Sequence, residues 1–372
     1  MKKLLHLQLL PLLSGVQRFS LHLLDGLDSS EFEIYVASKP GGEFEDAVKA
    51  RGYHYIALPT FRHPISLSDL FTFVHLLWLL KEQRFDIVHT NSSKPGLLGR
   101  LAARLCKVPL ILHTAHGTAF QESQKPLAYR FFVLLEDLGN RLGHRTIYVN
   151  HSDRLKCLDL GVITEDKATT IYNALPEEQV KALGNIANER KIPQGQVVIG
   201  STLRFSDQKN VINLVRAACL ACKQATNLKF IILGDGEHYA LCKAIVHTHG
   251  LEEQILLPGW DSDVSPWLKV FDAFVLYSRW EAMPFSIIEA MHSGLPVIGS
   301  DIPSIRELID SEAGYLIPLN AENELADTFV NIAQNFGPAF AKGQKAAQKV
   351  SQLSSYKAMI NGYREIYLAD PD

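Results

Sequence analysis

Residues 272–300 read DAFVLYSRWEAMPFSIIEAMHSGLPVIGS. The apolar runs at the two ends of this stretch, 272–278 and 296–300, have the length and composition of buried strands. The residues between them predict a helix. Pro284 fits its first turn, where the missing N–H of proline costs nothing, and Gly294 suits its C-terminal end. A strand, a helix and a second strand in this order predict a parallel sheet covered by helices.

The same alternation of strand and helix runs through both halves of the chain. After 320 only helical patterns follow, the last of them at 354–368. The segment 173–195 breaks the rhythm, because it is polar, holds two prolines and contains no core strand, so it is the best candidate for a linker. We therefore predict an α/β chain of two doubly wound, Rossmann-like domains. The expected strands are 3–10, 32–37, 53–58, 86–90, 109–113, 145–149 and 168–172, followed by 197–202, 228–234, 254–259, 272–278, 296–300 and 314–318.

The composition is that of a soluble globular protein. The chain has 372 residues, which suits two domains, with 47% apolar and 21% charged residues. A formal net charge of −3 gives no indication of nucleic-acid binding. The five cysteines are irregularly spaced, which fits a reducing compartment better than a disulfide framework. Cys219 and Cys222 form a C-x-x-C pair inside a helical pattern, so we expect buried helix cysteines rather than a redox motif.

The leucine-rich N-terminus, MKKLLHLQLLPLLSG, resembles a signal peptide. However, His6, Gln8 and Pro11 interrupt the apolar run, and no small-residue cleavage site follows. We expect a first buried strand from Lys3 to Leu10 instead.

The segment FTFVHLLWLL at 71–80 is too short to cross a bilayer, which takes about 20 apolar residues. Ser68 can cap a helix there, and Lys81–Glu82 can end it. We therefore expect a buried helix and no transmembrane segment.

Glu281 and Glu289 stand in the otherwise apolar stretch 272–300. Glu281 is expected in the loop before the helix and Glu289 a little over one turn inside it, so both can face the same cleft. The amides at a helix start favour phosphate, and a carboxylate one turn deeper can accept two hydrogen bonds from a vicinal diol. Equally, Glu281 could complement the helix dipole and Glu289 could meet a core arginine. This stretch alone leaves both interpretations open.

Arg204 and Lys209 fall in one predicted strand-to-helix loop, LRFSDQKN. Two cations at a helix start oppose the helix dipole, so the arrangement is unfavourable unless an anion binds there. A diphosphate would supply that anion. The alternative is a pair of solvated loop side chains.

Three further strand ends carry candidate residues. Gly15, in the loop after the first strand, lets backbone approach a ligand closely. His116 follows a strand and can hydrogen-bond a sugar hydroxyl, although a structural histidine fits as well. Gly234 and Asp235 belong to a glycine-rich strand end, LGDGE, that can border a nucleotide. The first loop is not G-x-G-x-x-G, which argues against an NAD site.

Asp261 and Asp263 match the D-x-D pattern with which other nucleotide-sugar enzymes hold a divalent metal. Ser265-Pro266 follows at once and resembles a helix N-cap with proline at the first helical position. We favour helix capping over a metal site.

Together these residues resemble the retaining glycosyltransferases of family 4, which have the GT-B fold. The resemblance rests on EAMPFSIIEAMHSGLPVIGSD (281–301), similar to the family's E-x7-E segment, and on LRFSDQKN (203–210), similar to its Arg/Lys loop. It covers nearly the whole chain. Further similar stretches are LGDGE (233–237), HTAHG (113–117), LSGVQRF (13–19) and DIVHTNSSKPGLLGRLAA (86–103).

The resemblance implies two Rossmann-like domains that face a cleft, with a nucleotide-sugar donor bound by the C-terminal domain and an acceptor by the N-terminal one. Glu289 would hold the ribose hydroxyls. Arg204 and Lys209 would hold the diphosphate and stabilise it as it leaves.

The resemblance also implies how the donor sugar is held. Glu281 and the amides around Met283 and Phe285 would position the sugar, and His116 would touch it from the other domain. Pro284, between those two residues, would also belong to the donor site. The product would keep the donor's anomeric configuration, and neither a metal nor any other cofactor would be required.

The expected domains follow the same resemblance. Residues 1–175 would form the acceptor-binding domain, 176–195 the linker and 196–352 the nucleotide-sugar-binding domain. A final helix within 353–372 would cross back onto the N-terminal domain.

The chain departs from the family pattern in two loops. Ser14-Gly15 stands where two glycines are usual, so the approach of this loop to the phosphates is looser. Asn173-Ala174 stands where Asn-Gly is common before the linker. Neither departure removes a side chain with an expected chemical role.

The substrates are less closely defined. By family frequency we expect a UDP-linked hexose or N-acetylhexosamine as donor, with GDP-mannose as the alternative. The acceptor would be a glycan or a polyprenyl-linked glycan in lipopolysaccharide or exopolysaccharide assembly. A nucleotide-sugar epimerase of similar fold and a non-catalytic nucleotide-sugar-binding protein are the competing classes, and no nucleic-acid partner is expected.

The segment KPLAYRFFVLLEDLGNRLGHR at 125–145 mixes cations with large apolar residues in the acceptor half. It fits a helix that lies on a membrane surface, near a lipid-linked acceptor, as well as an ordinary buried helix. We expect a cytoplasmic protein, with a peripheral place on the inner face of the plasma membrane under the first interpretation.

Overall fold

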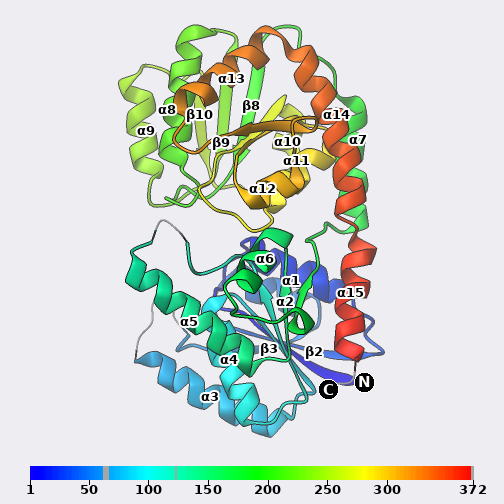
Figure 1. The fold of residues 1–372 in the computed structure, drawn as a ribbon. Coiled ribbons are helices and arrows are strands. Elements are labelled where there is room, and N and C mark those ends of the chain that lie inside the picture. The colour runs from blue at the N-terminus through cyan, green and yellow to red at the C-terminus, as the bar shows by residue number, and fades with distance from the viewer. Residues whose placement is uncertain (62–66, 122–123, 370–372) are drawn as a thin grey trace. The chain divides into compact units, whose positions relative to one another are not determined.

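The chain divides into two compact units (Figure 1). The first consists of residues 1–173 together with the residues from 356 onward, and the second of 174–355. Each unit is an α/β structure and is described by itself. The computed structural model describes residues 1–61, 67–121 and 124–369.

The first unit is built on a parallel sheet of seven strands in the order β3-β2-β1-β4-β5-β6-β7. The N-terminal leucines form an interior strand, hydrogen-bonded to β2 on one side and to β4 on the other. The expected buried strand is therefore confirmed, although it ends at Leu7 rather than Leu10. The strands are β1 (Lys2–Leu7), β2 (Phe32–Ser38), β3 (His54–Ala57), β4 (Ile87–Asn91), β5 (Leu110–Ala115), β6 (Arg145–Tyr148) and β7 (Ala168–Thr170).

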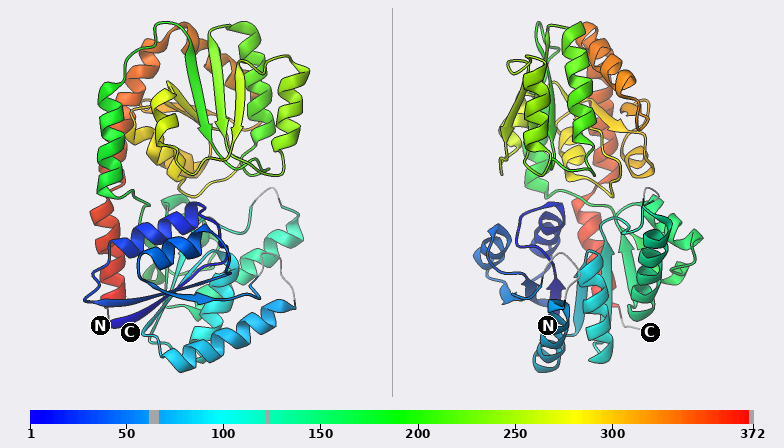
Figure 2. Two further views of the ribbon diagram at one scale, coloured as in Figure 1. Left: turned by 180° about the vertical axis from the view of Figure 1, so that it is seen from behind. Right: turned by 90° about the vertical axis from the view of Figure 1, so that its left-hand side faces the viewer.

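Helices cover both faces of this sheet (Figure 2). Helix α4 packs against α3 on one side and α5 on the other, so the three form one layer. Apolar side chains of β1, β4 and β5 pack against α3 and α4 in a buried cluster. The helices are α1 (Gly15–Asp25), α2 (Glu43–Ala50), α3 (Ser68–Gln83), α4 (Ser93–Leu105), α5 (Pro126–Leu142), α6 (His151–Asp159) and α15 (Tyr356–Leu368), with a short 3₁₀ helix at Glu165–Lys167.

The apolar segment at 71–80 is helical, but it is not buried as expected. This segment has apolar residues on every side of the helix, whereas only one side can meet the sheet. Ser68 is the first helical residue and not the cap, because Leu67 takes the N-cap position. In the part of the chain that the structure describes, no helix combines the length and apolar character needed to cross a membrane. The buried side of α3 is formed by Thr72, Leu76, Leu79 and Leu80. Its exposed side is formed by Leu70, Phe71, Val74 and Trp78.

Helix α15 belongs to the first unit through two buried tyrosines. The hydroxyl of Tyr367 lies 2.6 Å from Nδ1 of His89, in the centre of the sheet. The hydroxyl of Tyr363 lies 3.1 Å from Oγ1 of Thr114. Residues more than 240 positions apart in sequence thus share one buried polar network.

The second unit has a parallel sheet of six strands in the order β10-β9-β8-β11-β12-β13. The stretch 272–300 forms the strand–helix–strand unit that its pattern predicts, although Pro284 occupies the N-cap of α11 rather than its first turn. Gly294 follows the helix with φ of 69°, a left-handed conformation that favours glycine. The strands are β8 (Val197–Thr202), β9 (Leu228–Leu233), β10 (Ile255–Gly259), β11 (Ala273–Leu276), β12 (Val297–Ser300) and β13 (Gly314–Ile317).

The segment expected to be a linker falls in the second unit and contains α7. Leu183 and Ile186 of α7 are buried, and Arg190 donates to the backbone carbonyls of Leu268, Phe271 and Ser293. The helices of this unit are α7 (Glu177–Glu189), α8 (Val211–Gln224), α9 (Tyr239–Thr248), α10 (Ser265–Val270), α11 (Phe285–His292), α12 (Pro303–Leu308), α13 (Glu322–Gln334) and α14 (Phe336–Leu353).

The C-x-x-C pair lies in α8. Cys219 and Cys222 are both buried, and neither forms a disulfide. The expectation of buried helix cysteines is confirmed.

Candidate functional site

The carboxyl ends of β8, β9 and β11 carry the predicted site residues of the second unit. These strands are neighbours in the sheet, in the order β9-β8-β11. Because they are parallel, the loops that follow them lie at the same edge, where open α/β sheets bind ligands. The loops are 203–210 after β8, 234–238 after β9 and 277–284 after β11.

The β8 and β11 loops are joined by backbone and side-chain contacts. The backbone N–H of Arg279 donates to the carbonyl of Gln208 (2.8 Å), and Nε2 of Gln208 donates to the carbonyl of Trp280 (3.1 Å). The ammonium of Lys209 forms an ion pair with the carboxylate of Glu281. The exposed fractions of these two side chains are only 18% and 7%. Two residues with separate expected roles are thus in direct contact.

Arg204 lies in the same loop with its side chain exposed. Among the described residues, no side chain pairs with its guanidinium. Lys209, by contrast, uses one of its three N–H donors on Glu281 and keeps the others for a further acceptor. The loop therefore offers one guanidinium and one partly neutralised ammonium to an anion.

Glu289 lies just over one turn into α11 with 2% of its surface exposed. Gln179, from α7, donates from Nε2 to Oε1 of Glu289 at 3.2 Å. At the start of the helix, Met283 and Phe285 are buried, and Pro284 is half-buried. A carboxylate buried this deeply requires hydrogen-bond donors around it, and Gln179 supplies one of them.

The glycines of LGDGE allow the β9 loop to touch the β8 loop. Gly234 has φ of 134°, and a Cβ at this position would lie 1.7 Å from the carbonyl oxygen of Leu203. The N–H of Phe205 donates to the carbonyl of Asp235, and the N–H of His238 donates to the carbonyl of Phe205, both at 3.0 Å. The side chain of Asp235 is exposed. These contacts fix the position of the loop that carries Arg204.

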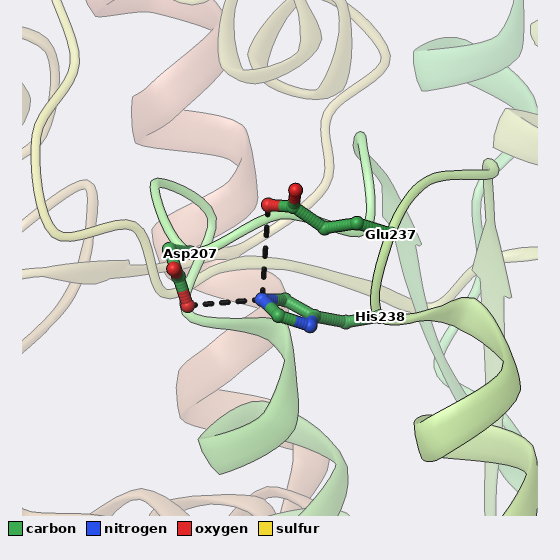
Figure 3. Close-up of side chains that lie close together, drawn as sticks. All are labelled: Asp207, Glu237 and His238. Carbon is green, nitrogen blue, oxygen red and sulfur yellow. Dashed lines mark hydrogen bonds and ion pairs between the residues drawn. The ribbon is translucent and has the colours of Figure 1, made fainter.

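Asp207, Glu237 and His238 bring three potential metal ligands together (Figure 3). Nε2 of His238 lies 2.9 Å from Oδ1 of Asp207 and 3.8 Å from Oε1 of Glu237. In the described part of the chain no other group of three such side chains is close enough to share an ion. Because one imidazole nitrogen already contacts both carboxylates, we interpret the group as a side-chain contact that joins the β8 and β9 loops, in addition to their backbone hydrogen bonds.

The carboxylates of the D-x-D pair make local hydrogen bonds at the start of α10. Oδ1 of Asp261 accepts from the N–H of Asp263, and Oδ1 of Asp263 accepts from the N–H of Ser265, both at 3.0 Å. Oδ2 of Asp261 accepts from the indole of Trp267 (2.8 Å), and this hydrogen bond lowers the pKa of Asp261. The expected N-cap at Ser265 is wrong, because Ser265 is the first residue of α10 and Val264 takes the N-cap position without a side-chain hydrogen bond.

Gly15 and His116 belong to the first unit. Gly15 is exposed and is the first residue of α1, as expected for a loop that ends in a helix. His116 follows β5, and its Nε2 lies 3.0 Å from Oδ1 of Asn91, the last residue of β4. The ring of Phe19 in α1 packs edge-on against His116 at a centroid distance of 4.6 Å. Burial lowers the pKa of His116 to about 3, so the ring is neutral at neutral pH.

The hydrogen bond to Asn91 also fixes the tautomer of His116. A carbonyl oxygen only accepts, so Nε2 of His116 carries the proton. Nδ1 then keeps its lone pair and is an acceptor. The ring is therefore arranged to receive a hydrogen bond from a hydroxyl group.

The sequence reasoning missed Gln179 and Asn91. Asn91 could have been found, because it is a polar residue at the carboxyl end of a strand, where ligand sites of α/β sheets lie. Gln179 carries no comparable signal, because it is one polar residue in a polar segment.

Comparison with known proteins agrees with this geometry. Residues 13–179 match the family described as Glycosyltransferase Family 4, and residues 196–335 match the family described as Glycosyl transferases group 1. The chain is 34% identical over 342 residues to the Escherichia coli UDP-Gal:alpha-D-GlcNAc-diphosphoundecaprenol alpha-1,3-galactosyltransferase. The match covers 88% of this chain and 86% of that protein.

Solved structures agree at the level of the fold. HepE from Anabaena, in complex with UDP and glucose, matches with a TM-score of 0.82 and 18% identity, covering 98% of this chain and 99% of that one. A TarM variant from Staphylococcus aureus, in a complex that includes UDP, matches with a TM-score of 0.77 and 14% identity, covering 99% and 100%. The two parallel-sheet units therefore have the GT-B fold. The chain belongs to glycosyltransferase family 4.

Proposed function

We propose that this glycosyltransferase moves a hexose or N-acetylhexosamine from a UDP-sugar to a polyprenyl-diphosphate-linked or glycan acceptor, with retention of anomeric configuration. The observation that carries the proposal is the joining of the β8 and β11 loops, which pairs Lys209 with Glu281 at the sheet edge where the same β8 loop exposes Arg204. The substrates are supported by relatives. The E. coli protein is named for a UDP-galactose donor and a diphosphoundecaprenol-linked acceptor, and HepE was crystallised with UDP and glucose.

The charges at this edge suit the bond changes of the reaction. The bond between the anomeric carbon and the diphosphate oxygen breaks, and the acceptor hydroxyl oxygen bonds to that carbon on the same face. The hydroxyl proton passes to the leaving diphosphate, so no protein nucleophile is needed. Negative charge grows on the diphosphate as it leaves, and Arg204 and Lys209 would stabilise it.

The remaining residues would hold the donor in place. Glu289, oriented by Gln179, would accept hydrogen bonds from the ribose hydroxyls. Glu281 would fix the ammonium of Lys209 and contact the sugar. Neutral His116, oriented by Asn91, would accept a hydrogen bond from a sugar hydroxyl at Nδ1.

The proposed reaction requires no metal. Arg204 and Lys209 supply the positive charge that Mg²⁺ or Mn²⁺ would otherwise supply to the diphosphate. The carboxylates of Asp261 and Asp263 already accept hydrogen bonds from α10 and the segment before it.

A polyprenyl-linked acceptor also bears on where in the cell the enzyme acts. Such an acceptor is held in the membrane by its lipid, whereas nucleotide sugars are water-soluble. We therefore place the protein at the cytoplasmic face of the membrane, as a peripheral protein.

The test is a donor panel of UDP-galactose, UDP-glucose, UDP-N-acetylglucosamine and GDP-mannose. Each is incubated in excess EDTA with a short-chain lipid diphosphate that carries N-acetylglucosamine. We expect transfer from a UDP-sugar, undiminished by EDTA, to a product whose anomeric configuration by NMR equals that of the donor.

Other outcomes identify the competing classes. Interconversion of the donor without acceptor would indicate an epimerase, and binding without turnover a nucleotide-sugar-binding protein. Faster transfer from GDP-mannose than from the UDP-sugars would change the proposed donor but not the proposed reaction. Loss of transfer in EDTA, restored by Mn²⁺, would overturn the assignment of the diphosphate to Arg204 and Lys209.

A further inference from the structure

Helices α3 and α5 of the first unit expose large apolar side chains in matching stripes. Phe71, Val74 and Trp78 are spaced three and then four residues apart, as are Phe131, Leu134 and Leu138. At 3.6 residues per turn this spacing places each set on one side of its helix. We call the exposed surface the α3/α5 face. It consists of Leu70, Phe71, Val74 and Trp78 of α3 and of Leu127, Phe131, Leu134 and Leu138 of α5.

The exposure of this face is large for apolar side chains of such size. Trp78 is 58% exposed, Leu134 is 62% exposed and Leu127 is 81% exposed. Both helices belong to one layer, because α4 packs against each of them and lies between them (Figure 1). The C-terminal end of α4 adds another exposed leucine, Leu105. Apolar residues that gather on one layer in this way mark a surface with a binding partner.

The charges around the face are mainly positive. Each stripe ends, three residues on, in an exposed cation, Lys81 in α3 and Arg141 in α5. Arg130 is exposed beside Phe131, and Lys125 is exposed just before α5.

The acids near the face are few and mostly neutralised. In α5, Glu136 is buried and Asp137 forms an ion pair with Arg141 at 2.9 Å. In α3, Asp69 forms an ion pair with Lys94. Glu82 is exposed, next to Lys81. An anionic surface therefore complements α5 better than α3.

This combination fits the surface of a bilayer. An amphipathic helix with leucine and phenylalanine on its apolar side and basic residues at its edges lies in the interface between headgroups and acyl chains. Tryptophan is enriched at the same depth, where its ring is apolar and its N–H is polar. Arginine at the edge of an apolar stripe can extend to lipid phosphates while its stem stays against the acyl chains.

We propose that the α3/α5 face docks the first unit onto a bilayer that contains anionic lipids. The proposal deepens the proposed function and rests on it for the reason to be at a membrane, since a lipid-linked acceptor is found there. The docking itself requires neither donor nor acceptor.

The test is flotation of the full chain with vesicles. One set contains phosphatidylglycerol and phosphatidylethanolamine, and the other phosphatidylcholine alone. We expect the wild type to float with the anionic vesicles and to be released by salt. Leu134→Asp and Trp78→Asp should each lower the partition coefficient by about tenfold or more, because a charge replaces an inserted apolar group.

Matched controls lie in the second unit. Leu241→Asp changes a leucine that is 49% exposed on α9 and should leave vesicle binding unchanged. In the first unit, Arg130→Gln tests the contribution of charge and should weaken binding to anionic vesicles roughly fivefold, as expected for one basic side chain near a charged surface. Its control in the second unit is Arg216→Gln, at an exposed position of α8, which should leave vesicle binding unchanged.

Three results would overturn the proposal. The wild type could fail to bind anionic vesicles, or Leu134→Asp could bind as the wild type does. Alternatively, the wild type could be a dimer that Leu134→Asp converts to a monomer without any vesicle binding, which would make the face a contact between two copies. Transfer to the short-chain acceptor without vesicles, measured in parallel, checks that each variant is folded. It also separates failure of docking from failure of the proposed transferase reaction.

Discussion

At the scale of single residues, the ion pair between Lys209 and Glu281 sets the charge of the site. A carboxylate beside the ammonium reduces the net positive charge that the β8 loop offers before a donor binds. Bound UDP-sugar already carries two phosphate charges, and the leaving diphosphate gains more. The pair is therefore better suited to a charge that grows during the reaction than to tight binding of the substrate.

Replacing Lys209 should accordingly affect turnover more than affinity. We expect Lys209→Ala to lower kcat on the order of a hundredfold, because a preorganised charge is lost where negative charge develops, while the Kd of the UDP-sugar changes less. The measurements are steady-state kinetics and calorimetry. Lys223→Ala, an exposed lysine of α8, is the control. Lost affinity with normal turnover would reassign Lys209 to ground-state binding.

Replacing Glu289 should have the opposite effect. A diol that loses a charged acceptor loses roughly 1.5–3 kcal/mol, which is on the order of a tenfold to hundredfold weaker Kd for Glu289→Ala. Calorimetry with UDP alone is the direct measurement, because UDP keeps the ribose and lacks the sugar. Glu253→Ala, an exposed carboxylate of the same unit, should bind normally. Unchanged affinity in a folded Glu289→Ala would remove the ribose role.

The sequence predicts which single residues belong to the site better than it predicts their contacts. Glu281, Glu289, Arg204 and Lys209 could be selected because charges at strand ends and helix starts need a partner. That Glu281 and Lys209 meet each other could not be predicted, because the two lie 72 positions apart and pair only through the strand order.

At the scale of elements, the strands were predictable and the exposure of the helices was not. Each strand contains a short apolar run that marks its position locally, although its last residue can differ from the end of the run, as in β1. Whether a helix is covered depends on which neighbours the topology provides. The segment at 71–80 has apolar residues on all sides, so its pattern does not indicate which side of the helix is buried. The expectation that the whole helix is buried was wrong.

The contact between the β8 and β9 loops can be tested at Gly234. Gly234→Ala should lower both thermal stability and donor affinity, because its Cβ would meet the carbonyl of Leu203 and displace the loop that carries Arg204. Gly250→Ala is a matched control, since Gly250 also has a positive φ, 64°, but has open space around it. It should cost only about 1–2 kcal/mol of stability, from the left-handed backbone, and leave donor affinity unchanged. Equal effects of the two variants on donor affinity would contradict this account.

At the scale of the whole molecule, the two units differ in their buried histidines. In the first unit, burial lowers the pKa of His6 and His116 to about 3, and that of His89 and His113 well below the usual value. In the second unit burial lowers the pKa of His292 to about 4. Because these pKa values are lower in the folded state, the unfolded chain binds more protons as the pH falls below about 6.5. The first unit therefore carries more acid-sensitive groups than the second.

We expect the first unit to open before the second on acidification. Its stability should be complete above pH 6.5 and fall toward pH 3, by up to about 1.4 kcal/mol per pH unit for each such histidine. Hydrogen exchange at pH 7.5 and 5.5, corrected for intrinsic rates, should show lost protection in β4 and β5 while β11 and β12 stay protected. Earlier loss in the second unit would refute the assignment.

The hydrogen bonds of α15 to the first sheet have a consequence for biosynthesis. The second unit is one continuous segment, whereas the first is completed by a helix that the ribosome makes after all of the second unit. Multidomain chains generally fold from the N-terminus as they emerge. Here the order should be reversed, because His89 and Thr114 lack their tyrosine partners until α15 is free. We expect nascent chains from which residues up to 355 have emerged, but α15 has not, to hold a protease-resistant second unit and a protease-sensitive first one.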